Sequence, residues 1–159
     1  MISGPSPLLR SVPRDQAPHI TGKWLSTCAG IVERYLGTVN KFLGDGLLGY
    51  WPANDGSARA VAGALTALKK LQATADLPFR VVLHFGQVWA GGPASRGEES
   101  LTGQEVTFVF RMEKLAAVQG VSMLVSEAAR TQLGNLLAFQ PHGAHAVADF
   151  PGEFDFFTC

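Results

Sequence analysis

The spacing of hydrophobic residues predicts an amphipathic helix near the start of the chain. From Ile20 onward, apolar residues recur every three or four positions, and Gly37 follows them as a helix stop. The stripe consists of Ile20, Trp24, Leu25, Cys28, Ile31, Val32 and Tyr35. Prolines at positions 5, 7, 13 and 18 exclude an uninterrupted helix or central strand before it. We therefore expect residues 1–17 to form a loop, with at most a short extended piece near Leu8 and Leu9.

A β-hairpin is predicted next. Two short runs of β-branched, aromatic and aliphatic residues flank Gly44-Asp45-Gly46. A two-residue Asp-Gly connection is a strong local signal for a hairpin, so Asp45 is expected at its tip. Lys41 lies on the first strand, and the tight turn keeps it and Asp45 near one end of the hairpin. On turn chemistry alone, an ordinary surface turn with a solvated lysine is the simpler interpretation.

The remaining pattern alternates helices and strands. A second helix, capped by Asn54 or Asp55, would bury Val61, Ala64, Leu65, Leu68 and Leu71 and expose Lys69 and Lys70. A strand over 79–85 follows, continued or reversed by 87–90, and then a loop over 91–100. A capping box at residues 102–105 predicts a helix to about Ala117, which Gly120 ends. A strand over 121–125 and a helix from Ser126-Glu127 to about Leu133 follow, and the tail is expected to form two or three short strands. This order is typical of an α+β fold with an open sheet covered by helices.

Composition limits the possible functions. The chain has 159 residues, of which 47% are hydrophobic, which suits one domain over 1–159 with a substantial core. Lysine plus arginine equals aspartate plus glutamate at 13 each, so no whole-chain field favours nucleic acid or an anionic membrane. Cys28 and Cys159 make no disulfide framework, which suits a reducing compartment. With no apolar run of membrane-spanning length and no leader pattern, we expect a cytoplasmic protein or a piece of one.

Three segments, in order along the chain, resemble the catalytic domain of class III adenylate and guanylate cyclases. They are Gly37-Thr38-Val39-x-Lys41-Phe42-x-Gly44-Asp45-Gly46 after an amphipathic helix, His84-Phe85-Gly86-Gln87-Val88 followed by Gly91-Gly92, and 101–115 with Ser126-Glu127 beyond. The resemblance covers about Thr21 to Cys159. It implies a ferredoxin-like open sheet covered by helices on one face.

The resemblance also implies a metal site. Cyclisation of a nucleoside triphosphate depends on positioning and on neutralising phosphate charge, usually with two metal ions held on carboxylates. Asp45 matches the hairpin aspartate of the family, which would bind Mg²⁺ or Mn²⁺. The second aspartate belongs on a strand before the first helix, and its position falls at or just before Met1. The first strand is therefore expected to be missing, or replaced by residues 7–12 or by a second chain.

Base recognition and phosphate contacts follow from the same resemblance. Lys41 and Ser100 match the positions that read the purine, and a cationic donor suits N1 of adenine. Seen singly, each would be an exposed lysine or a loop serine. Thr107 and Arg111 are four apart on one helix face and match the ribose-orienting asparagine and the phosphate-stabilising arginine. Arg111 pairing with a surface glutamate, Glu113 or Glu105, is an equal alternative. The phosphate-binding lysine of the family falls on Ala148.

These departures predict weak activity or none in a homodimer of this chain. The sequence is interpreted as an adenylate-type cyclase domain, degenerate or truncated at its amino end, that binds ATP or a related nucleotide. It would work as a homodimer or as a heterodimer with another cyclase domain, without nucleic acid and without a membrane segment. The alternatives are a non-catalytic dimerising or nucleotide-sensing regulatory module, and an unrelated α+β domain with a coincidental hairpin. His84 is expected to be a structural residue, not a base.

Overall fold

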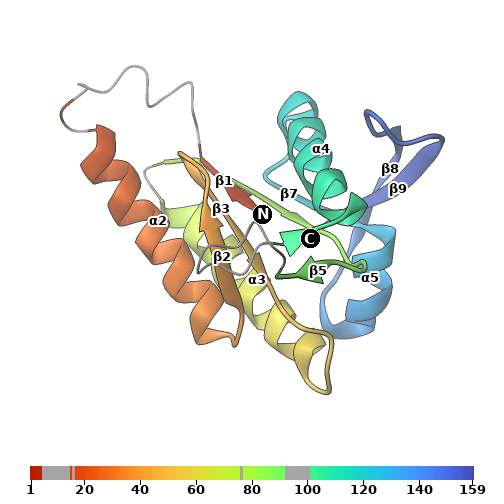
Figure 1. Ribbon diagram of the computed structural model, residues 1–159, viewed down its shortest axis with the longest axis horizontal. Coiled ribbons are helices and arrows are strands. Elements are labelled where there is room, and N and C mark those ends of the chain that lie inside the picture. The colour runs from red at the N-terminus through yellow and green to blue at the C-terminus, as the bar shows by residue number, and fades with distance from the viewer. Residues whose placement is uncertain (5–14, 16, 76, 92–100) are drawn as a thin grey trace. The chain divides into compact units, whose positions relative to one another are not determined.

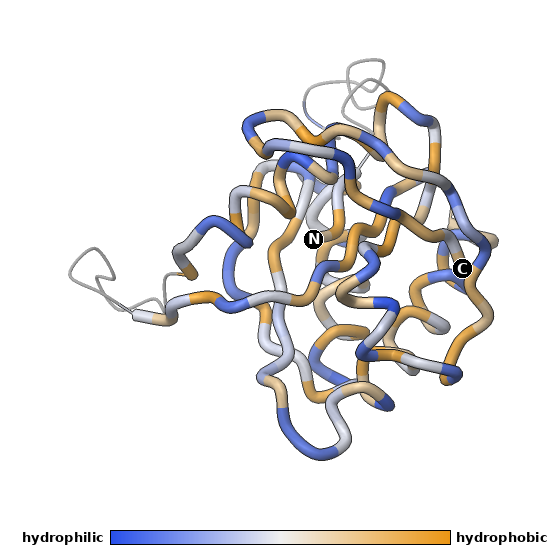
Figure 2. Tube along the Cα trace, turned by 90° about the vertical axis from the view of Figure 1, so that its right-hand side faces the viewer, coloured by the Kyte–Doolittle hydropathy of each residue, from blue (hydrophilic) through white to orange (hydrophobic). Residues whose placement is uncertain are grey.

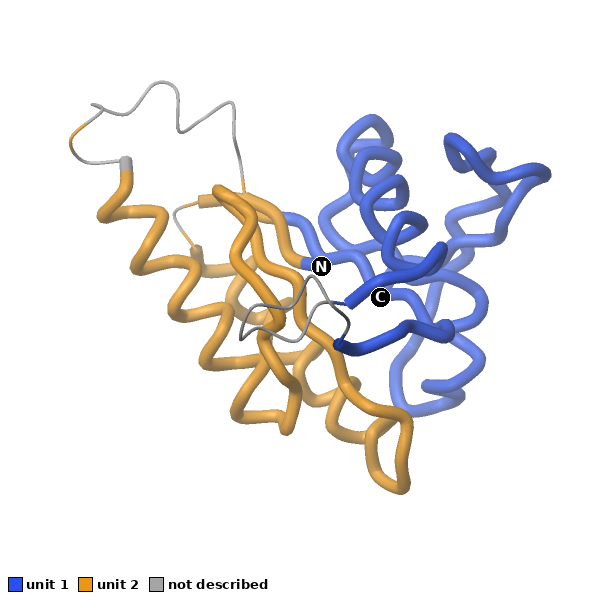
Figure 3. Tube along the Cα trace, viewed as in Figure 1, with its two compact units in different colours: residues 1, 80–159 blue, residues 2–79 orange. Residues whose placement is uncertain are grey.

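The chain folds into two compact units of mixed α+β structure. The computed structural model describes residues 1–4, 15, 17–75, 77–91 and 101–159 (Figure 1). One unit comprises residues 2–79, and the other comprises Met1 with residues 80–159 (Figure 3). The predicted piece near Leu8 and Leu9, the replacement strand over 7–12 and most of the loop over 91–100 lie outside the described residues.

The unit of residues 2–79 has two helices and three strands in its described part. They are β1 (Ile2–Ser3), α2 (Ala17–Arg34), β2 (Thr38–Phe42), β3 (Gly46–Tyr50) and α3 (Ser57–Thr74). The predicted apolar stripe packs as expected, because Trp24, Leu25, Cys28 and Val32 of α2 are buried. On α3, Ala62, Ala64, Leu65 and Leu68 are buried, whereas Lys69 and Lys70 are exposed. Both helices and the hairpin are confirmed.

The first strand is present, contrary to the expectation of a loop over residues 1–17. In β1, Ile2 faces Leu47 and Ser3 faces Gly46 in antiparallel register with β3. Ile2 and Ser3 are both buried. This edge of β3 is therefore paired with the chain's own first residues, and neither residues 7–12 nor a second chain is needed there. Pairing, not local sequence pattern, makes Ile2–Ser3 a strand.

The unit of Met1 and residues 80–159 contains a mixed sheet. Its elements are β4 (Arg80–Leu83), β5 (Trp89–Ala90), β6 (Leu101–Thr102), α4 (Gln104–Gln119), β7 (Met123–Ser126), α5 (Glu127–Leu133), a 3₁₀ turn (Gly134–Leu136), β8 (Gln140–Ala146) and β9 (Glu153–Thr158). Strand β4 pairs in parallel with β7, β7 pairs antiparallel with β9, and β9 pairs antiparallel with β8. Met1 lies beside β4, where its amino group donates to the Val82 carbonyl and its carbonyl accepts from the Val82 amide. The separate ribbon of β5 and β6 is antiparallel.

The core of this unit lies between α4 and the sheet. Its buried members are Val82, Phe108, Met112, Ala116, Leu124, Val147 and Phe156. Figure 2 colours the chain trace by hydropathy and shows hydrophobic and hydrophilic stretches alternating along it. Phe108 is the central ring, with ring centroids at 5.0 Å from Phe150, 5.0 Å from Phe154 and 6.4 Å from Phe156. This cluster fixes α4 and the turn between β8 and β9 against each other.

The predicted ends of α3, α4 and α5 agree with the structure in part. Helix α5 begins after Ser126 as expected, and the Ser126 hydroxyl caps it by accepting from the Ala129 amide. Gly120 ends α4, also as expected, in the left-handed conformation. The predicted cap of α3 at Asn54 or Asp55 is wrong, because Gly56 occupies the N-cap position and Asn54 instead hydrogen-bonds the Ser57 hydroxyl. The capping box at 102–105 is wrong as well, because the N-cap of α4 is Gly103, which makes no side-chain cap.

The described helices include none that is both long enough and apolar enough to cross a membrane. Cys28 and Cys159, both within the described residues, form no disulfide. Cys28 is fully buried on α2, and this burial raises the pKa of its thiol to about 12. A thiol with so high a pKa stays protonated at neutral pH, which makes Cys28 an unreactive packing residue.

Candidate active site

Asp45 lies at the tip of the hairpin formed by β2 and β3. Leu43 and Gly46 close the turn with two backbone hydrogen bonds of 2.7 and 3.1 Å. The two central residues are therefore Gly44 and Asp45, one position earlier than the predicted Asp-Gly pair. Gly44 has φ of 63°, the positive value that this type of tight turn requires at its first central position. The hairpin and its acidic tip are thus confirmed with a shifted turn.

The hairpin tip touches the end of β1. The Gly4 amide donates to the backbone carbonyl of Asp45 at 2.7 Å. A Cβ at Gly4 would lie 2.8 Å from that carbonyl oxygen and 3.2 Å from the Trp24 ring, so only glycine allows this approach. The contact fixes the backbone of Asp45 and leaves its side chain half-buried at the turn.

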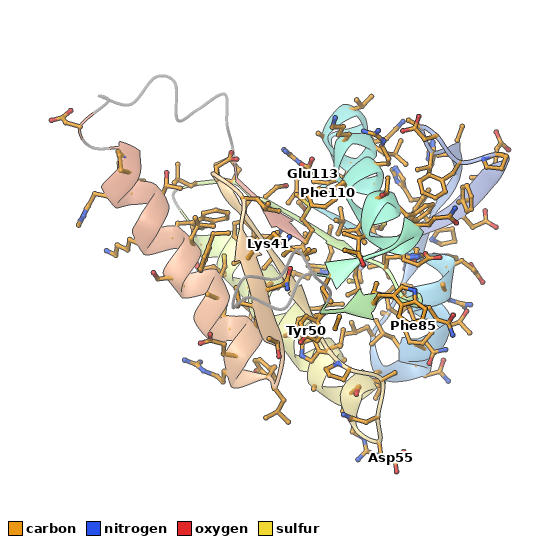
Figure 4. The ribbon with its side chains drawn as sticks, in the orientation of Figure 1. Lys41, Tyr50, Asp55, Phe85, Phe110 and Glu113 are labelled. Carbon is orange, nitrogen blue, oxygen red and sulfur yellow. The ribbon has the colours of Figure 1, made fainter. Side chains whose placement is uncertain are left out.

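Lys41 lies on β2, where it faces Leu48 of β3 just after a bulge. Its side chain is half-buried, and Figure 4 labels it on the hairpin strand. Lys41 and Asp45 therefore belong to the same hairpin, as predicted. Ser100, the other residue assigned to base recognition, lies outside the described residues.

Thr107 and Arg111 both lie on α4, one turn apart, as predicted. Thr107 is exposed and Arg111 is half-buried. The Arg111 guanidinium is bound by Asp149: Nε donates to Oδ2 at 2.7 Å, and Nη2 lies 2.5 Å from the same oxygen. The expected partners of Arg111 are wrong, because Glu113 binds Arg80 and Glu105 binds His84. Figure 4 labels Glu113 on α4.

Asp149 sits in a tight turn that α4 holds in place. The Phe150 amide donates to the Val147 carbonyl at 3.0 Å, which closes a four-residue turn with Ala148 and Asp149 at its centre. Asp149 has φ of 71°, a conformation that aspartate tolerates better than most residues. On either side, Val147 is buried in the core and Phe150 packs edge-on against Phe108. Ala148, which matches the lysine position of the family, lies beside this carboxylate.

His84 connects the end of β4 to α4 and α5. Its Nε2 lies 2.5 Å from Glu105 Oε2, and its Nδ1 lies 2.8 Å from Ser126 Oγ. Because a carboxylate only accepts, Nε2 carries the proton, and in the neutral ring Nδ1 accepts from the Ser126 hydroxyl. Ser126 is 4% exposed and already accepts from the Ala129 amide, so its hydroxyl is a structural cap and not a nucleophile. The expectation that His84 is structural fits these contacts.

Gly86 explains the His-x-Gly pattern of this segment. A Cβ at Gly86 would lie 2.6 Å from Glu105 Cγ, so the Glu105 side chain lies directly against the glycine backbone. The Glu105 carboxylate reaches His84 from this position. The motif thus docks the first turn of α4 onto the residues that follow β4. The sequence pattern singles out the His84-x-Gly86 segment and Glu105 separately, but it does not predict that they are in contact.

Comparison with solved structures identifies the fold. A bacterial light-regulated adenylyl cyclase matches 99% of this chain with a TM-score of 0.76 and 20% identity. An adenylyl cyclase from P. aeruginosa matches 98% with a TM-score of 0.73 and 18% identity, covering 88% of that chain. The guanylate cyclase domain from Catenaria anguillulae, in complex with GTP, matches 98% with a TM-score of 0.78 and 20% identity, covering 91% of that chain.

The fold is that of a class III nucleotidyl cyclase catalytic domain. This chain spans about half of the light-regulated cyclase, 49% of its length. No protein-family model and no curated protein sequence matches the chain. The cyclase fold therefore rests on the structural match, which includes both adenylyl and guanylyl cyclases.

The described residues do not form the two-aspartate metal site that the cyclase resemblance implies. No group of three histidine, cysteine, aspartate or glutamate side chains gathers within the described ranges. Asp45 would contribute one carboxylate, and neither residue of β1 (Ile2–Ser3) is acidic. One carboxylate suits a Mg²⁺ ion only when substrate phosphates and water complete its six ligands. This chain therefore has no preformed two-ion site among those residues.

Proposed function

We propose that this chain is a nucleotidyl cyclase-like domain of adenylate type that is weakly active or inactive alone. Its reaction would be the conversion of ATP to cyclic AMP and pyrophosphate, within a homodimer or a heterodimer with another cyclase domain. The observation that carries the proposal is Asp45, held at the hairpin tip against the end of β1 in a chain with the cyclase fold. Mg²⁺ or Mn²⁺ would be the metal, bound jointly by Asp45 and the nucleotide phosphates.

Adenine preference is supported by Lys41 on the hairpin strand. The lysine ammonium only donates hydrogen bonds, so it matches the N1 acceptor of adenine and not the protonated N1 of guanine. Ser100 would make the second base contact. In this proposal, Thr107 orients the ribose with a hydroxyl, which offers fewer hydrogen bonds than an amide.

Low activity is supported by three departures from the cyclase pattern. Met1, Ile2 and Ser3 supply no metal carboxylate, Ala148 replaces the phosphate-binding lysine, and Arg111 already binds Asp149. Loss of one well-placed charge-stabilising donor typically slows an enzyme by about 10²- to 10³-fold. Even with strong non-additivity, the absence of both the second metal carboxylate and the phosphate-binding lysine would leave little turnover.

The test is cyclic nucleotide formation by the purified chain with ATP and manganese. We expect no cyclic AMP above the level of a protein-free control. Rapid turnover that Asp45→Ala abolishes and Asp55→Ala leaves intact would contradict the proposal of low activity. Asp55 is a suitable control because it is an exposed aspartate of the same unit, in the connection before α3.

A second candidate is a non-catalytic dimerising or nucleotide-sensing regulatory module. The Arg111–Asp149 ion pair favours it, since it occupies the guanidinium that catalysis would need. Calorimetric titration separates the possibilities. ATP binding weakened by Asp45→Ala would support nucleotide sensing, and a preference for ATP over GTP that Lys41→Glu reverses would support the adenine assignment. Absence of binding at millimolar ATP would exclude nucleotide sensing and leave a purely structural role.

A further inference from the structure

The carboxylate of Asp149 occupies the anion-binding side of Arg111. Both Nε and Nη2 of the guanidinium point at one oxygen, Oδ2, at 2.7 and 2.5 Å. A guanidinium recognises a carboxylate and a phosphate with the same planar arrangement of N–H donors, so the two anions are interchangeable partners. The Nε–Nη2 edge of Arg111, one of the edges by which a guanidinium binds phosphate, is therefore occupied by a group of this chain.

The placement of Asp149 is built into the fold. Its turn is anchored on one side by buried Val147 and on the other by Phe150, which packs against Phe108. Phe108 precedes Arg111 by one turn of α4, so the same cluster positions both the Asp149 carboxylate and the Arg111 guanidinium. No long flexible segment has to be ordered before the carboxylate contacts the guanidinium. The effective concentration of the carboxylate at Arg111 is therefore high.

The ion pair is nevertheless open to competition. The Arg111 side chain is 33% exposed and that of Asp149 is 62% exposed. Solvent screens a pair with this exposure, so its own contribution to stability is small. A triphosphate carries more charge than one carboxylate and would be bound by the same kind of donors. An exposed, screened carboxylate in its place would lower the affinity for phosphate without abolishing it.

We propose that Asp149 is an internal competitor that sets the affinity of Arg111 for the phosphate groups of a nucleotide. The inference rests on the proposed function for its ligand, a nucleoside triphosphate, but the competition itself concerns only Arg111, Asp149 and a polyphosphate. Removing the negative charge should free the guanidinium. Asn is the suitable replacement, because it keeps the side-chain shape and tolerates the left-handed backbone of position 149.

The experiment is titration of the full chain with inorganic tripolyphosphate and, separately, with ATP. Asp149→Asn should tighten tripolyphosphate binding by roughly three- to tenfold, the size expected for removing one screened charge next to the anion. Asp155→Asn is the matched control, since it removes the same charge from an exposed position on β9 of the same unit. Arg111→Gln added to Asp149→Asn should cancel the gain.

The outcomes separate the two proposals. Equal tightening by Asp149→Asn and Asp155→Asn, no tightening by Asp149→Asn, or a gain that survives Arg111→Gln would each overturn the competition. ATP binding that depends on Asp45 but not on Asp149 would leave the proposed function in place and reject the competitor. A gain for tripolyphosphate that requires Arg111, with no binding or conversion of ATP, would support the competitor and reject the nucleotide function.

Discussion

His84 and Glu105 are joined by a contact of 2.5 Å between Nε2 and Oε2, which links the end of β4 to the first turn of α4. The His84 side chain is 11% exposed and that of Glu105 is 38% exposed. On its other side the imidazole contacts Ser126, the cap of α5. One histidine therefore ties a strand to two helices, including the helix that carries Thr107 and Arg111.

This contact predicts that Glu105→Ala destabilises the chain by about 1 kcal/mol, the net worth of one such hydrogen bond. Gly86→Ala should cost a similar amount, because the new Cβ would displace the Glu105 side chain from His84. Urea denaturation of both single variants and the double variant measures this. Since both changes break the same contact, the double variant should lose clearly less than the sum. Gln104→Ala, at an exposed neighbouring position, should have little effect.

The amino group of Met1 predicts a pH dependence of stability. Burial lowers its pKa from about 8 to about 5, although the Glu113 carboxylate opposes the shift. Between these pH values the folded amine is neutral while the unfolded amine binds a proton, so unfolding takes up protons and stability rises with pH. A chain that starts at Met1 should lose about 3 kcal/mol of unfolding free energy between pH 8 and pH 5, most of the roughly 4 kcal/mol that a shift of three pKa units is worth in full.

Chemical denaturation at a series of pH values measures this slope. The matched control is the same chain with an acetylated amino terminus, which has no ionisable group there. Histidines and carboxylates titrate in both forms, so the difference between the two profiles isolates the amine. Identical profiles would show that the Met1 amino group keeps its ordinary pKa in the folded chain.

Local signals were enough to predict most of the fold. The apolar stripe of α2, the hairpin around Asp45 and the start of α5 at Ser126-Glu127 each depend on residues within a few positions, and each is confirmed. The hairpin turn centres on Gly44 and Asp45, one position earlier than predicted. The strand β1 was missed because two residues, Ile2 and Ser3, show no periodicity, and only pairing with Leu47 and Gly46 makes them a strand. The capping box failed because Glu105 is drawn to His84, 21 residues away.

The candidate site was harder to predict because its contacts join residues that lie far apart in the sequence. Arg111 was correctly placed on α4, but its partner lies 38 residues further along the chain. Asp149 reaches Arg111 because a turn with positive φ, between buried Val147 and partly buried Phe150, places its carboxylate against α4. Neither the turn conformation nor its packing on Phe108 leaves a short-range pattern. The assignments of Lys41, Asp45, Ser100, Thr107 and Arg111 to nucleotide binding remain predictions.

The aromatic cluster predicts that Phe108→Ala disrupts both α4 and the Asp149 turn. Phe108 is 4% exposed and contacts the rings of Phe150, Phe154 and Phe156. Truncation of a buried phenylalanine typically costs about 3–5 kcal/mol, from lost burial and the cavity that remains. Thermal or urea denaturation measures the loss. Val118→Ala on the same helix is the control, because Val118 is 83% exposed and should change stability by less than about 0.5 kcal/mol.

The contact between β1 and the hairpin predicts that Gly46→Ala damages the region around Asp45. A Cβ at Gly46 would lie 2.8 Å from the Ile2 carbonyl oxygen, a backbone atom that cannot move without breaking the pairing of Ser3 with Gly46. We expect lower stability and faster amide exchange at Gly4, whose amide donates to Asp45. Gly22→Ala is the control: it lies within α2 with nothing within 4 Å of its new Cβ. That change should stabilise the chain by about 0.5–1 kcal/mol through helix propensity. If Gly46→Ala is as stable as the parent and Gly4 stays protected, β1 does not depend on this close approach, and the first strand cannot be what fixes the backbone of Asp45.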